Sequence, residues 1–203
     1  MDNKMDDISA PPARKYLRNL FRDAAKIDIE VGYFTFEGWQ EVYSVIPKNA
    51  RIRMIIGMLP EESFQKSANV EESVVEAIAK ESLLNKMDPD QKRDFKILRD
   101  IVNRLFEGSM QVRGHWKIHG KMYASKKRFR RPRIIVGTGN ISKNALHPKK
   151  RFRQGNIWVL AVQPKLMPVL QNQFTKDWKA SKDVSQQLLK RISKKLEEAK
   201  NFS

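Results

Sequence analysis

The sequence contains no cysteine in 203 residues, which excludes disulfide bonds and thiolate metal sites. No apolar run approaches the length of a membrane span, and residues 1–16 have no apolar segment of signal-peptide length. We therefore expect a cytoplasmic protein without a membrane partner.

Acidic residues are also missing from one long stretch of the chain. The span from Gly108 to Lys176 contains 16 of the 40 Lys and Arg residues and no Asp or Glu. The rest of the chain has 24 basic and 23 acidic residues, so almost all of the net charge of +17 lies in this span. Segregated positive charge favours a polyanionic partner, most commonly nucleic acid. The alternative is a basic face that serves solubility alone.

The apolar pattern predicts an α/β fold. Hydrophobic residues make up 40% of the chain, which is enough for one well-buried domain. Alternating apolar residues predict strands at about 27–33 and 52–58, with a short helix at about 37–45 between them. This β-α-β order implies a parallel strand pair with a right-handed crossover.

The remaining periodicity places further elements along the chain. Helices are expected at about 13–25, 69–87, 89–106, 164–181 and 184–202, and strands at about 116–124, 134–136 and 157–162. We expect a flexible leader over residues 1–11, one domain over 12–181, and a C-terminal amphipathic helix within 182–203. That helix could pack on the domain, bind a partner, or lead toward a further domain.

The basic span contains a His-Gly-Lys triplet. On a strand, residues two apart face the same way, so His119 and Lys121 are expected to point to one side of the sheet. Gly120 between them keeps the opposite face small. The alternative for His119 is a buried, hydrogen-bonded core histidine.

A Gly-Thr-Gly-Asn tetrapeptide follows the strand expected at 134–136. It brings Asn140 to a helix N-terminus expected near Ile141, where free backbone N–H groups favour a phosphate oxygen. An imidazole, a cation, an amide donor and an anion-binding backbone are the parts needed to attack a phosphodiester and stabilise its five-coordinate transition state. The segment has no acidic ligand, so neither a metal nor another cofactor is expected.

These two motifs resemble the signature of the phospholipase D superfamily, His-x-Lys followed by Gly-Ser-x-Asn, with Thr138 in place of Ser. The similarity is to the nuclease branch with one motif per chain, which includes metal-independent bacterial nucleases and phospholipase D-type restriction endonucleases. It covers about residues 13–180. It implies a phospholipase D-like catalytic domain with a mixed, largely parallel sheet flanked by helices on both faces.

The resemblance also implies a mechanism. Family enzymes use two motifs, so a chain with one motif implies a homodimer with a shared active site. His119 of one protomer would attack phosphorus to form a phosphohistidine, and His119 of the other would protonate the leaving oxygen and then activate water. Lys121, Asn140 and Thr138 would stabilise the phosphoryl oxygens.

The sequence departs from the family pattern at two carboxylates. Lys126 stands where the family has Asp, and Gln154 or Asn156 lies nearest to the position of a Glu that orients the histidine. A carboxylate from the first strand region could substitute, the candidates being Asp28, Glu30 and Glu37. The alternative to an enzyme is therefore a catalytically impaired nucleic-acid-binding protein of the same fold.

Charge indicates the substrate. Two basic loops with interleaved Phe residues flank the motifs, an arrangement suited to a phosphate backbone. The residues expected to bind nucleic acid are Lys126, Lys127, Arg128, Arg130, Arg131, Lys143, Lys149, Lys150, Arg151 and Arg153. We expect a DNA endonuclease, with RNA as the other substrate, serving as the catalytic module of a restriction or defence system with a separate specificity domain or subunit. A phosphatidyl hydrolase is the weaker alternative, because no amphipathic membrane-surface helix accompanies the motifs.

Overall fold

The computed structural model describes residues 12–32, 34–57, 92–115, 118–128, 130, 132–141, 146, 158–161 and 165–200. The expected leader and the expected helix at 69–87 lie outside the described residues. The second basic loop, which contains Lys149, Lys150, Arg151 and Arg153, also lies outside them.

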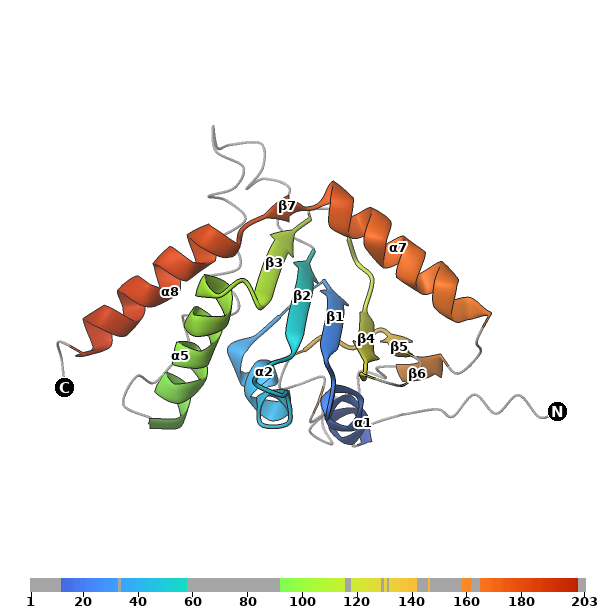
Figure 1. The fold of residues 1–203 in the computed structure, drawn as a ribbon, viewed down its shortest axis with the longest axis horizontal. Coiled ribbons are helices and arrows are strands. Elements are labelled where there is room, and N and C mark those ends of the chain that lie inside the picture. The colour runs from blue at the N-terminus through green and yellow to red at the C-terminus, as the bar shows by residue number, and fades with distance from the viewer. Residues whose placement is uncertain are drawn as a thin grey trace, which may run out of the picture.

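A mixed seven-stranded sheet in the order β6-β5-β4-β1-β2-β3-β7 forms the centre of the described chain (Figure 1). The strands are β1 (Lys26–Val31), β2 (Arg51–Ile56), β3 (Met110–Gly114), β4 (Met122–Lys126), β5 (Arg133–Gly137), β6 (Trp158–Ala161) and β7 (Lys182–Asp183). β2 pairs in parallel with both β1 and β3, and all the other strand pairs are antiparallel. The expected α/β fold with a mixed sheet is confirmed, with parallel pairing confined to β1, β2 and β3.

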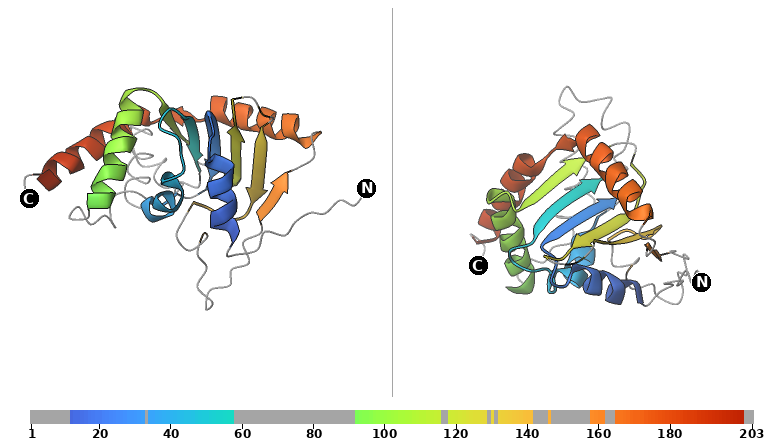
Figure 2. Two further views of the ribbon diagram at one scale, coloured as in Figure 1. Left: turned by 60° about the horizontal axis from the view of Figure 1, so that its bottom comes forward. Right: turned by 45° about the vertical axis from the view of Figure 1, so that its right-hand side comes forward.

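Helices cover both faces of the sheet, as expected (Figure 2). They are α1 (Pro12–Phe21), α2 (Phe36–Tyr43), α5 (Lys92–Phe106), α7 (Leu166–Ala180) and α8 (Ser185–Lys200). Apolar side chains of α1, α2, α5 and α8 form the larger core on one face, and α7 packs on the other.

The alternation in β1 explains these two faces. Ile27, Ile29 and Val31 are fully buried in the larger core, and each stabilises the fold by roughly 1.5–3 kcal/mol. Asp28 and Glu30 lie between them in sequence and therefore point to the face that α7 covers. The strand thus places two carboxyl groups on the smaller, α7-covered face.

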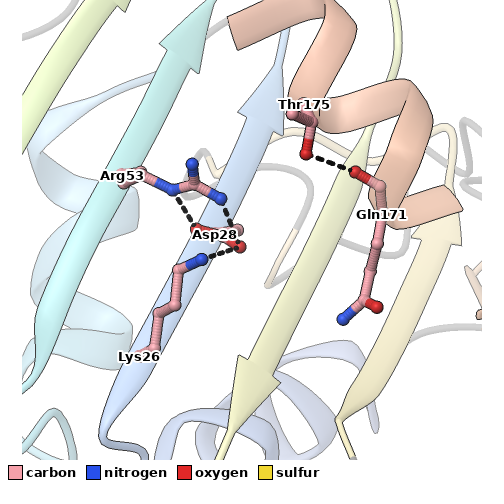
Figure 3. Close-up of polar contacts among 5 residues, drawn as sticks. All are labelled: Lys26, Asp28, Arg53, Gln171 and Thr175. Carbon is pink, nitrogen blue, oxygen red and sulfur yellow. Dashed lines mark hydrogen bonds and ion pairs between the residues drawn. The ribbon is translucent and has the colours of Figure 1, made fainter. Parts of the chain in front are cut away.

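Asp28 is neutralised on this face by neighbouring cations (Figure 3). The Arg53 guanidinium donates two hydrogen bonds to its carboxylate, at 2.7 and 2.9 Å, and the Lys26 amine lies 3.3 Å away. The same guanidinium lies over the rings of Phe174 and Trp178 of α7, 4.8 and 5.1 Å from their centroids. This charge network is a packing element between the sheet and α7.

The amphipathic C-terminal segment packs on the domain. Leu188 and Ile192 of α8 are buried in the larger core, where α8 lies against α5 and β3. The Ser185 hydroxyl accepts a hydrogen bond from the Val112 N–H at 2.9 Å. Of the three roles considered for this segment, packing on the domain is therefore the one that the structure shows.

Two local predictions differ from the structure. The strand β3 was not anticipated, because it offers only two apolar positions, Met110 and Val112, after the helix end at Gly108. The strand expected at 116–124 begins only at Met122, so His119 and Lys121 lie in the loop that precedes it. Among the described residues, no helix is both long enough and apolar enough to cross a membrane.

Candidate active site

The His119-Gly120-Lys121 loop lies at the carboxyl ends of the parallel strands. The arrowheads of β1, β2 and β3 point to one edge of the sheet, and antiparallel β4 starts at that edge (Figure 1). Carboxyl ends of parallel strands are the usual place for ligand sites in open α/β sheets. The motif is therefore in a position suited to function, although it is not on a strand.

Two glycines allow this loop to lie close to the strand ends. A Cβ atom on Gly57, directly after β2, would lie 1.9 Å from the carbonyl oxygen of Ile118. A Cβ atom on Gly120 would lie 2.1 Å from Oε1 of Glu30. Both contacts are possible only because glycine has no side chain. The two glycines therefore allow the loop to approach β1 and β2 this closely.

His119 and Lys121 contact each other. The Lys121 amine lies 2.7 Å from Nδ1 of His119 and donates a hydrogen bond to the His119 carbonyl oxygen, also at 2.7 Å. His119 is exposed, whereas Lys121 is only 6% exposed, and this burial lowers the pKa of its amine. The interpretation of His119 as a buried core residue is wrong.

Hydrogen bonds join the two motifs. The Gly137 N–H donates to the Lys121 carbonyl oxygen at 3.0 Å, and the Tyr123 hydroxyl donates to the Gly139 carbonyl oxygen at 2.7 Å. Tyr123 is completely buried, which raises the pKa of its hydroxyl well above its usual value and keeps it a donor. The Gly-Thr-Gly-Asn tetrapeptide is thereby fixed beside the His-Gly-Lys loop.

The residue after the tetrapeptide is also connected to the segment between β1 and α2. Ile141 forms a parallel bridge with Phe34, and its carbonyl oxygen accepts a hydrogen bond from the Thr35 N–H at 2.9 Å. Thr138 is exposed and Asn140 is half-buried in this segment. Of the helix N-terminus expected near Ile141, Ile141 itself is this bridge residue and residues 142–145 lie outside the described residues, so the anion-binding backbone stays a prediction.

The contact between Lys121 and His119 determines the imidazole tautomer. An ammonium group donates and cannot accept, so the lone pair must be on Nδ1 and the hydrogen on Nε2. In this tautomer Nε2 carries the hydrogen and has no lone pair available, so it cannot attack phosphorus. Attack by Nε2 requires that the amine move away from Nδ1 or lose its proton.

Glu30 is the candidate carboxyl group that contacts the motif. Its register neighbours are Ile55 on β2 and Met122 on β4, and it is 7% exposed. Burial and, secondly, the negative charge of Asp177 on α7 together raise the pKa of Glu30 to about 7. Asp28 is engaged by Arg53, and Glu37 lies in the first turn of α2.

The first basic loop lies away from the motif, contrary to expectation. Lys126 ends β4, and the β4–β5 hairpin turn follows it, whereas His119 precedes the start of β4. Met122 and Lys126 are four residues apart along β4, which corresponds to a distance of about 13 Å. The sequence places the loop near the motif, but β4 carries it to the opposite edge of the sheet.

The side chains of this hairpin differ in surroundings. Lys126, Arg128 and Arg130 are exposed, and the half-buried Lys127 amine lies 3.3 Å from the Asp23 carboxylate. The other residues expected to bind nucleic acid lie outside the described residues: Arg131, Lys143, Lys149, Lys150, Arg151 and Arg153.

Sequence reasoning missed two residues that shape the site. Gly57 lies within the strand expected at about 52–58, and nothing in the sequence indicated that its missing side chain admits the Ile118 backbone. Tyr123 lies two residues after Lys121, and a polar aromatic residue at strand spacing from the motif was the available signal. Among the described residues, no group of three or more His, Cys, Asp or Glu side chains could bind a metal ion.

Comparison with known proteins finds similarity in structure only. No protein-family model matches the chain, and no curated protein is significantly similar in sequence. An archaeal chromatin protein, TrmBL2, whose structure shows a mode of DNA binding, is similar over 87% of this chain and 52% of its own, with 8% identity and a TM-score of 0.49. Phosphatidylserine synthase of Haemophilus influenzae Rd KW20 is similar over 92% of this chain and 42% of its own, with 13% identity and a TM-score of 0.49. The chain spans about half the length of these two proteins.

Proposed function

We propose that this protein is a metal-independent phosphodiesterase that cleaves DNA through a phosphohistidine intermediate. The supporting observation is the exposed His119, whose Nδ1 lies 2.7 Å from the Lys121 amine in a loop hydrogen-bonded to the Gly-Thr-Gly-Asn segment. The resemblance of these motifs to the phospholipase D superfamily supports the same chemistry.

In the proposed first step, Nε2 of His119 attacks phosphorus. A P–N bond forms, the P–O bond to the leaving oxygen breaks, and the imidazolium of His119 in a second protomer gives its proton to that oxygen. In the second step, the second imidazole takes a proton from water, which attacks phosphorus and releases His119. Lys121, Thr138 and Asn140 bind the phosphoryl oxygens in both steps.

Binding of substrate would also convert His119 to the tautomer that can attack phosphorus. A phosphoryl oxygen attracts the Lys121 ammonium more strongly than a neutral imidazole nitrogen does. When the amine turns to the phosphate, Nδ1 can carry the hydrogen and the Nε2 lone pair becomes available. On this proposal the substrate itself activates the nucleophile.

Charge supports a nucleic-acid substrate. The exposed hairpin cations Lys126, Arg128 and Arg130 lie about 13 Å or more from the motif, which corresponds to roughly four nucleotides of a strand. They would bind backbone phosphates beyond the scissile bond and supply no sequence readout. We propose DNA as the substrate, with RNA as the other nucleic acid to test, and a restriction or defence system with a separate specificity domain or subunit as the setting.

The test is nicking of supercoiled plasmid in the presence of EDTA. Wild type should nick the plasmid, and His119→Ala should abolish nicking while DNA affinity stays within about twofold. The matched control is His115→Ala, the same change directly after β3, which should keep most of the activity. Cleavage that requires a divalent metal, or that survives His119→Ala, would refute the proposal.

The second candidate is a nucleic-acid-binding protein of the same fold that has lost the reaction. The observation in its favour is that the Lys121 amine, and not a carboxylate, lies at Nδ1 of His119, while Lys126 occupies the position of the family's Asp. Salt-sensitive DNA binding by wild type without nicking between about pH 5 and about pH 9 would select this candidate.

A further inference from the structure

Glu30 is the one carboxyl group on β1 whose position is tied directly to the His119-Gly120-Lys121 loop. Its Oε1 occupies the space that a Cβ atom on Gly120 would need, at 2.1 Å from the ideal Cβ position, and its Cδ lies 3.2 Å from that position. The carboxyl group and the loop backbone are therefore in close packing contact. Movement of Glu30 toward the loop would displace Gly120, and movement away would remove a packing contact of Gly120.

The other neighbours of Glu30 leave it little room. In the sheet it lies between Ile55 of β2 and Met122 of β4, both buried apolar residues. From α7 the Asp177 carboxylate acts on it and, with burial, disfavours the charged form. A protonated carboxyl group fits these surroundings better than a carboxylate does.

The remaining charged groups on this face have partners of their own. Asp28, next on the same face of β1, pairs with Arg53 of β2 and with Lys26. Arg113 of β3, in register with Ile55, donates to the Trp178 carbonyl oxygen at 2.6 Å and lies over that ring. Neither guanidinium is a partner of Glu30 in the described contacts.

We propose that Glu30 is a positioning residue that fixes the His119-Gly120-Lys121 loop through its contact with Gly120, and so sets where the nucleophile and the cation lie. This inference rests on the proposed phosphodiesterase function. The neutral carboxyl group packs against Gly120 and fixes the loop. The ionised form lies between the apolar residues Ile55 and Met122 and is repelled by the charge of Asp177. It therefore attracts water and shifts away from the loop.

The first experiment measures amide hydrogen exchange of the loop without DNA. In wild type, the protection factors of the Gly120 and Lys121 amides should fall about tenfold as the pH rises from about 6 to about 8. Glu30→Gln, which has the same shape and no charge, should abolish this fall. Asp28→Asn is the matched control, on the same strand and face, and should retain it. An unchanged fall in Glu30→Gln would overturn the inference.

The second experiment uses nicking kinetics. In wild type kcat should fall as the pH rises through about 7, and in Glu30→Gln this fall should be shallower, because only the loss of the His119 imidazolium remains, with KM within about twofold. Gly120→Ala should lower kcat at least about tenfold because its methyl group displaces the loop. Glu30→Ala should restore part of that loss in the double variant, since it vacates the space. Additive losses in the double variant would overturn the inference.

The two experiments separate the two proposals. If the exchange protection of the loop amides depends on Glu30 but the protein cleaves no DNA, the positioning role is supported and the phosphodiesterase function is refuted. Cleavage that depends on His119 with no response of loop protection to Glu30→Gln would support the function and refute the positioning role.

Discussion

The hydrogen bond between Lys121 and His119 predicts the tautomer of the free protein. The two nitrogen atoms are 2.7 Å apart, and a hydrogen bond from a charged donor contributes about 1.5–3 kcal/mol. That range favours the tautomer with hydrogen on Nε2 by roughly 10- to 150-fold over the Nδ1–H form. The nucleophilic form should therefore be a minor species until substrate binds.

The assay is NMR of ¹⁵N-labelled imidazole at about pH 8, above the ordinary titration range of histidine. The His119 ring should show the Nε2–H pattern in wild type, and Lys121→Met should move it toward a mixture. Because burial lowers the pKa of the Lys121 amine, the preference in wild type should weaken at high pH, as the amine loses its proton. A wild-type ring that is mainly Nδ1–H at about pH 8, or a spectrum unchanged in Lys121→Met, would refute the reasoning.

Three further predictions concern the groups around the site. Tyr123→Phe removes the donor to the buried Gly139 carbonyl oxygen and should lower the free energy of unfolding by about 1–3 kcal/mol, measured by urea denaturation. Because the pKa of Glu30 is raised from 4.5 to about 7, folding takes up a proton between these values, and stability should fall with rising pH across that window by about 3 kcal/mol. Glu30→Gln should remove this fall, and urea denaturation series at about pH 5 and about pH 8 compare the two proteins. Replacing either Lys126 or Arg130 by Gln should reduce the slope of log affinity against log salt by about 1, and an unchanged slope would remove the hairpin from the DNA interface.

Much of the fold was predictable because its elements alternate strongly. Strand β1 has apolar residues at every second position, and the β1-α2-β2 order predicts the parallel pair that the structure contains. The helices α5, α7 and α8 have apolar stripes at turn spacing, and all were expected close to their observed bounds. Local periodicity is sufficient in such segments because burial of one face decides the structure.

The site was predictable in its motifs but not in its supports. His119, Lys121 and the Gly-Thr-Gly-Asn segment were recognised, and the structure brings their loops together. The position of the basic hairpin could not be inferred from sequence distance, because the length of β4 separates it from His119. The contact of Glu30 with Gly120 depends on the pairing of β1 with β4, which lie almost a hundred residues apart. Non-local register of this kind leaves no local pattern in the sequence.

The most direct test of the account is a search for DNA covalently bound to His119. The reaction with plasmid in EDTA should be quenched in alkali, where a phosphohistidine bond survives, digested with protease, and analysed by mass spectrometry. We expect a nucleotide adduct on the peptide that contains His119 in wild type and none in His119→Ala. Metal-free cleavage by wild type without any adduct, or an adduct on another residue, would contradict the proposed mechanism.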